Sequence, residues 1–174
     1  MSDDLSTRFI LHWGEMSSRW GINRSVAQIH ALLFLSKEPL NAEQISDVLG
    51  LARSNVSNSL REVQAFGVVR VVHRIGDRRD YFESEKDVWA MVRAIIEHRK
   101  KREVDPTLDM LSVCVRDAEN SDTDEYTLNR MKELQELLES MARLFDQVST
   151  LPLPAQKKVL KMGGKIRKLG TGKA

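Results

Sequence analysis

Residues 42–66 have the sequence AEQISDVLGLARSNVSNSLREVQAF, and the prediction of the fold starts from this stretch. Asn41 can cap a first short helix, with Gln44 at the capping-box position three residues later. Gly50 ends that helix, and a second helix starts about three residues further on and runs from Arg53 to Phe66. Two helices joined by so short a turn are typical of a helix-turn-helix.

The second helix has two faces of different chemistry. Val56, Leu60 and Val63 recur at helical spacing and are expected to face inward. The rest of the helix offers hydrogen-bond donors and acceptors suited to base edges and phosphates. The candidate DNA-binding residues here are Arg53, Ser54, Asn55, Ser57, Asn58 and Arg61. An ordinary surface helix with a polar side would give the same pattern, so the helix alone leaves both interpretations open.

A β-hairpin is predicted directly after this helix. Residues 68–74 are rich in valine and predict a strand, Gly76-Asp77 predicts a turn, and residues 80–84 predict the returning strand. The tip of the hairpin is basic, with Arg74, Arg78 and Arg79 as further candidate DNA contacts. Taken alone the tip could be a solvated turn. A helix-turn-helix followed by a basic hairpin is, however, the order of a winged helix, which favours DNA binding.

Two further helices carry apolar stripes that a second subunit could cover. One lies at residues 5–20, and its stripe is formed by Leu5, Phe9, Trp13, Met16 and Trp20. The other lies at residues 124–149, where apolar residues alternate in steps of three and four, as in a heptad seam. The candidate dimerisation residues in this seam are Met131, Leu134, Leu138, Met141, Phe145 and Val148. Packing against the chain's own helices is the equal alternative for the seam.

The net charge of +2 is a sum of unlike segments. Residues 49–102 carry 12 Lys and Arg against 7 Asp and Glu, whereas residues 103–147 carry 4 against 12. Such segregation indicates that different segments face different partners. We therefore expect a winged helix-turn-helix domain with an N-terminal helix at residues 1–102, a helical dimerisation region at 103–169 and a flexible basic tail at 170–174.

The chain resembles the MarR-type winged-helix transcriptional regulators, and is most similar to their GbsR-like branch. The residues that carry the resemblance are Leu49–Val63, Gly67-Val68-Val69, Gly76–Phe82 and Asp87-Val88-Trp89. The resemblance covers about residues 5–110, whereas the last third matches only in being helical. It implies a dimeric DNA-binding regulator with a recognition helix at 53–66 and a wing at 69–84. It also implies a phosphate or minor-groove contact from Arg78 or Arg79.

Other ligands and activities are less well supported by the sequence. Trp13, Trp20 and Trp89 suggest a cation–π site for a quaternary ammonium effector, although core packing is the commoner use of such residues. The four histidines form no metal-ligand pattern, the single cysteine has no catalytic signature around it, and the glycines of the tail do not have phosphate-loop spacing. We expect no enzyme activity, no metal and no cofactor.

The sequence thus predicts a mainly α-helical protein with a small β-hairpin wing. Its predicted function is that of a homodimeric transcriptional regulator, a repressor, which binds double-stranded DNA sequence-specifically. The alternative is a winged-helix protein-interaction module within a larger assembly. No apolar run is long enough for a membrane helix, and the start of the chain carries no secretion signal pattern, so we expect a cytoplasmic protein.

Overall fold

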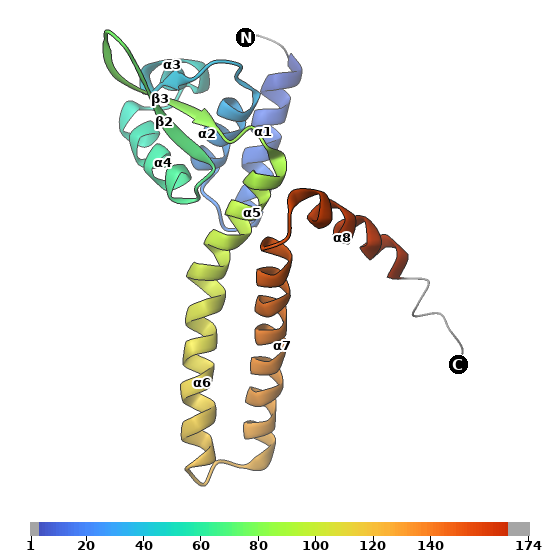
Figure 1. The fold of residues 1–174 in the computed structure, drawn as a ribbon. Coiled ribbons are helices and arrows are strands. Elements are labelled where there is room, and N and C mark those ends of the chain that lie inside the picture. Colours follow the sequence, from blue (N-terminus) through green and yellow to red (C-terminus); the bar gives the residue numbers. More distant parts are fainter. Residues whose placement is uncertain (1–3, 167–174) are drawn as a thin grey trace. The chain divides into compact units, whose positions relative to one another are not determined.

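The computed structural model describes residues 4–166, and the chain forms two compact units, residues 1–98 and 99–174 (Figure 1). The elements of the first unit are α1 (Asp4–Arg19), α2 (Arg24–Leu35), β1 (Leu40–Asn41), α3 (Ala42–Leu49), α4 (Arg53–Ala65), β2 (Val69–Arg74), β3 (Asp77–Ser84) and α5 (Val88–Arg99). Those of the second are η1 (Lys100–Val104), α6 (Asp105–Glu119), α7 (Glu125–Ser149) and α8 (Leu153–Ile166). The predicted fold class is confirmed. The boundary at residue 102 stays a prediction, and the predicted tail at 170–174 lies outside the described residues.

The helix-turn-helix forms through the local signals that predict it. The Asn41 side chain accepts a hydrogen bond from the Gln44 amide, and the Gln44 side chain accepts one from the Asn41 amide, which completes the capping box of α3. Gly50 ends α3 with φ of 63°, a left-handed conformation that suits glycine. Only Leu51 and Ala52 then separate Gly50 from the start of α4, so the turn between the two helices is tight.

α2 is the centre of the first unit. Every residue from Val26 to Leu33 is buried, because α1, α4 and β3 all pack around this helix. Val56, Leu60 and Val63 of α4 are buried in the same apolar core, as their spacing predicts. α4 therefore presents one fixed face inward and leaves its polar face toward solvent.

α1 turns a different face to the core than its apolar stripe suggests. The buried residues of α1 are Ile10, Gly14 and Ser17, whereas Leu5 and Phe9 of the stripe are exposed. A Cβ atom at Gly14 would lie 2.7 Å from Cγ of Gln28, so the small residues let α1 approach α2 closely. Packing in the core therefore does not explain why most positions of this stripe are apolar.

The wing is part of a three-stranded antiparallel sheet in the order β1-β3-β2. Leu40 pairs with Phe82 and Asn41 with Tyr81, so the two residues before α3 form a short strand that is not among the elements predicted from the sequence. A two-residue strand has too few positions to show an alternating pattern, which is why sequence periodicity misses it. This strand ties the base of the wing to the start of α3.

The second unit contains an α6–α7 hairpin, followed by α8. One turn of π-helix, η1, leads directly into α6, and Pro106 follows it as the second residue of α6. Lys100 Nζ lies 3.0 Å from Asp105 Oδ1 and 3.5 Å from Asp146 Oδ2, which links η1 to α7. Among the helices that the structure describes, none has the length and apolar character needed to cross a membrane.

His30 on α2 gives the first unit a predicted dependence on pH. Burial lowers the pKa of His30 to about 4, and its Nε2 lies 3.4 Å from Ser84 Oγ. The unfolded chain, with a histidine pKa near 6.5, therefore binds this proton more readily than the folded chain. We expect the free energy of unfolding to fall by about 3 kcal/mol as the pH drops from about 6.5 to about 4.

Urea denaturation at a series of pH values measures this effect. His30→Gln should flatten the curve over that range, whereas the matched change His12→Gln, at an exposed position on α1, should leave it as it is. An unchanged slope in His30→Gln would assign the acid sensitivity to other groups.

Candidate nucleic-acid interface

The outer face of α4 is polar, exposed and almost free of negative charge. Ser54, Ser57, Asn58 and Arg61 are all exposed and lie opposite the buried Val56. Glu62 is the only acidic residue in the helix. Short hydroxyl and amide side chains flanked by an arginine can approach base edges closely while the arginine contacts a phosphate.

Two of the α4 side chains that are predicted to contact DNA interact with other residues of the protein. Asn55 Nδ2 donates a hydrogen bond of 3.1 Å to Ser25 Oγ at the start of α2, and Asn55 Oδ1 accepts one of 3.2 Å from Ser59 Oγ. Arg53 forms an ion pair with Glu43 of α3. These side chains therefore help to set the position of α4 on its neighbours.

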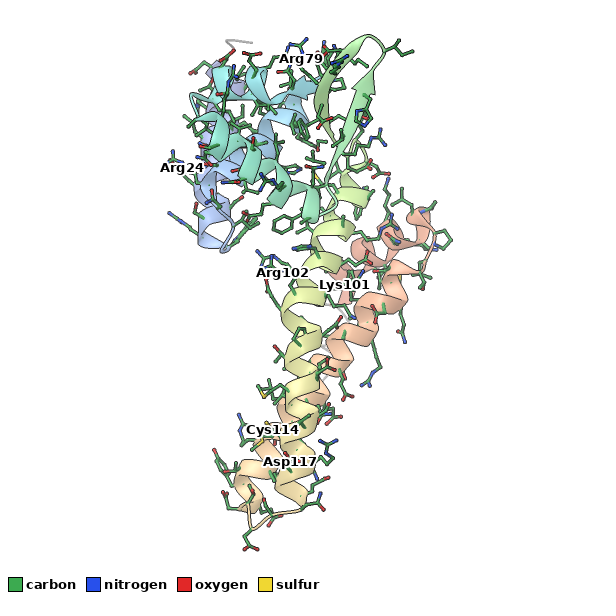
Figure 2. All side chains as sticks on the ribbon, turned by 90° about the vertical axis from the view of Figure 1, so that its left-hand side faces the viewer. Arg24, Arg79, Lys101, Arg102, Cys114 and Asp117 are labelled. Atoms are coloured by element: carbon green, nitrogen blue, oxygen red, sulfur yellow. The ribbon has the colours of Figure 1, made fainter. Side chains whose placement is uncertain are left out.

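The wing carries an arginine in a preformed geometry. Arg79 is labelled in Figure 2. Its Nε and Nη2 both donate hydrogen bonds to the Asp77 carboxylate, over 3.0 and 2.6 Å, and Tyr81 donates a third over 2.8 Å. The hydrogen bonds from Arg79 hold the pKa of the Asp77 carboxyl well below its usual range, and the same contact raises the pKa of Arg79. Asp77 therefore stays ionised and keeps the guanidinium of Arg79 oriented on the wing.

The other two wing arginines differ in how they are held. The Arg74 guanidinium lies 4.1 Å from the centre of the Tyr81 ring, and one of its nitrogens lies 3.4 Å from the Pro39 carbonyl oxygen. Arg78 is exposed next to the turn. The structure thus places all three arginines on one hairpin, two of them packed along its body.

α4 and the wing border a common groove of about 560 Å³. Its lining includes Arg53, Ser57 and Arg61 from α4, together with Arg79 and Asp80 from β3. The groove also contains Gln64 and Glu43, which the sequence analysis did not select. The position of Gln64, three residues after Arg61 on the same helix face, is the signal that could have identified it.

The candidate dimerisation residues fall on two sides of α7. Gln135 donates a hydrogen bond of 3.2 Å to Ser112 of α6, which marks the side of α7 that faces α6. The residues that are half-buried are Met131, Leu138, Phe145 and Val148. Leu134 and Met141 are exposed, as are Leu137 and Leu144. We call Leu134, Leu137, Met141 and Leu144 the α7 outer face.

The three tryptophans lie in different settings within the first unit. Trp13 stacks on Phe9 with ring centroids 5.6 Å apart and packs partly against the core. Trp20 follows the end of α1 and is exposed, and Trp89 is half-buried in the first turn of α5. A shared site for a quaternary ammonium ion stays a prediction.

The helix-turn-helix and the wing match a known family. Residues 20–80 match the model of the MarR family. Over these residues the chain is similar to the MarR family. The HTH-type transcriptional regulator YvaV of Bacillus subtilis (strain 168) is 22% identical over 81 residues, which cover 47% of this chain and 46% of YvaV. The match thus spans about half the length of that curated relative.

A solved structure extends the comparison to most of the chain. The crystal structure of a transcriptional regulator superposes with a TM-score of 0.67 and 20% identity, covering 82% of this chain and 93% of that chain. At that level of identity the match shows a common fold.

Within the winged helix, the predicted site residues differ in what holds them. Ser54, Ser57, Asn58 and Arg61 form the exposed face of α4. Carboxylates that the sequence analysis overlooked, Glu43 and Asp77, hold two of the arginines. Over residues 4–166, no group of three or more His, Cys, Asp or Glu side chains is arranged to hold a metal ion.

Proposed function

We propose that the chain is a sequence-specific regulator of transcription that binds double-stranded DNA as a homodimer and represses its target. In this proposal α4 enters the major groove and the wing, residues 69–84, lies on the backbone or in the adjacent minor groove. The observation that carries the proposal is that Ser57 and Arg61 of the polar face of α4 and Arg79 of the wing border the same groove. We also place the protein in the GbsR-like branch and in the cytoplasm, on the sequence resemblance.

Each part of this interface has its own physical role. Arg79, fixed by Asp77, is suited to a phosphate contact, because an oriented guanidinium loses little side-chain freedom on binding. Asn58 is suited to adenine, since its amide can donate a hydrogen bond to N7 and accept one from the N6 amino group in one bidentate contact. Asn55 and Arg53 position the helix through Ser25 and Glu43.

Homodimerisation supplies the second recognition helix. The α7 outer face and the exposed residues of α1, such as Leu5 and Phe9, are apolar surfaces that a second copy would cover. A two-fold dimer would read two half-sites about one helical turn apart. The proposal therefore expects a palindromic operator.

Selection of bound duplexes from a random DNA pool tests the function directly. We expect enrichment of a palindrome, saturable binding, and an affinity that falls steeply with salt because counterions are released from phosphates. Repeating the selection with choline or betaine tests for a quaternary ammonium effector. A chain with no saturable binding to duplex DNA at moderate salt would instead favour the alternative, a protein-interaction module that docks through its winged helix.

Asn58 and Asn55 offer a matched pair of alanine substitutions. Asn58→Ala removes an exposed amide from the outer face of α4, and we expect about a tenfold loss on the selected operator with altered base preference at one position. Asn55→Ala removes an amide that is bonded to Ser25 and Ser59, and we expect weaker binding to all sequences alike.

Fluorescence anisotropy titrations on the operator and on single-base variants separate the two results. Equal losses on every DNA for Asn58→Ala would refute its role in reading sequence. A changed base preference in Asn55→Ala would show that its amide leaves Ser25 to contact DNA.

A further inference from the structure

Ile75, at the tip of the wing, is the most exposed of the large apolar side chains that the structure describes. Its exposed fraction is 108%, so no part of the chain within residues 4–166 covers it. It sits between Arg74 and the turn residue Gly76, in the hairpin that extends beyond the neighbouring helices in Figure 1. The side chain is apolar where a solvated turn would normally carry a polar residue.

The turn itself does not require an isoleucine. Arg74 pairs with Asp77 across the hairpin, which leaves Ile75 and Gly76 as the two-residue loop. Gly76 has φ of 83°, and this positive φ is the only feature of the loop that demands a particular residue type. The turn therefore does not determine which side chain stands at position 75, and that side chain can serve a contact outside the chain.

The surroundings of Ile75 favour a polyanion as its partner. Arg74 and Arg79 are held along the hairpin by Tyr81 and Asp77, and Arg78 lies exposed just beyond the loop. Asp77 is neutralised by Arg79, and Asp80 lies 3.6 Å from His73. An apolar tip flanked by arginines matches a narrow groove whose sugar walls offer C–H surface and whose rims are phosphates.

We infer that Ile75 enters the DNA minor groove and there makes the wing selective for A·T pairs. The inference rests on the proposed function. The minor groove is about 6 Å wide, which admits the narrow two-residue tip of a hairpin but not a helix. Its floor is smooth at A·T pairs, whereas each G·C pair projects the guanine N2 amino group into it. An isoleucine methyl group would contact the groove floor at an A·T pair and would collide with the amino group at a G·C pair.

Inosine isolates this contact. An inosine·cytosine pair presents the major groove of G·C but lacks the N2 amino group, so its minor groove resembles that of A·T. The base pairs to vary are those that the full-length protein protects in the minor groove, as mapped by hydroxyl-radical footprinting on the selected operator. We expect the wild-type chain to bind the A·T and inosine·cytosine operators about tenfold more tightly than the G·C operator.

Ile75→Ser should reduce that difference to less than about twofold, with an unchanged melting temperature because the residue is fully exposed. Arg78→Ala is the matched control: we expect weaker binding to all three DNAs with the tenfold difference kept. The inference would be overturned if Ile75→Ser kept the full tenfold difference in affinity between the operators. It would also be overturned if only Arg78→Ala lost that difference. Absence of saturable binding by the wild-type chain would overturn the proposed function itself.

Discussion

Replacement of Leu137 and Met141 by glutamate is expected to convert the proposed homodimer into a monomer and to weaken operator binding about a hundredfold. Both side chains are more than half exposed on the α7 outer face, at 57% and 59%. In a dimer that buries this face, two glutamates from each subunit would lose water without gaining a partner. A monomer binds only one half-site, so it loses the gain in affinity that comes from linking two recognition helices.

The fold of each chain should survive this double substitution. Surface changes away from the core usually alter stability by less than about 0.5 kcal/mol. The control is Asn129→Glu with Gln147→Glu, which adds the same charge at two exposed positions roughly a quarter turn round the same helix. Sedimentation equilibrium and thermal melting measure mass and folding for both variants. A dimeric Leu137→Glu, Met141→Glu variant would move the interface away from α7, with α1 as the remaining candidate.

A second large effect is expected from aspartate placed on opposite faces of α4. Val56 is 0% exposed in the core of the first unit, and Val56→Asp would bury a charge without a partner. Such a change costs at least about 4 kcal/mol, a large part of the stability of a small domain. We expect Val56→Asp to unfold the first unit and to lose all DNA binding as a consequence.

Asn58→Asp is the matched substitution, two residues further along the same helix. Asn58 is exposed, so we expect a melting curve like that of the wild type. Binding to DNA should nevertheless fall about a hundredfold, because the carboxylate would enter the field of the phosphates and can no longer donate a hydrogen bond. Circular dichroism and anisotropy titrations separate loss of fold from loss of binding. Strong DNA binding by Asn58→Asp would refute the placement of this face in the groove.

Local signals in the sequence determined much of the winged helix. The capping box at Asn41 and Gln44, the left-handed Gly50 and the inward spacing of Val56 and Leu60 are all readable within a few residues of each other. They can be predicted because helix periodicity and caps depend on neighbours in the chain. The order of helix, helix and basic hairpin then suffices for the fold class and for the exposed face of α4.

Only the tertiary structure decided which of the candidate residues are held by the protein itself. Asn55 meets Ser25 across thirty residues and Arg53 meets Glu43 across ten, so their engagement follows from how α2, α3 and α4 pack. The same holds for β1, which is defined by its pairing with β3, and for α7, whose apolar residues divide between the side facing α6 and the outer face. Hydrophobic periodicity shows that a helix has an apolar side, but it carries no information on which neighbour, or which distant polar group, that side will meet.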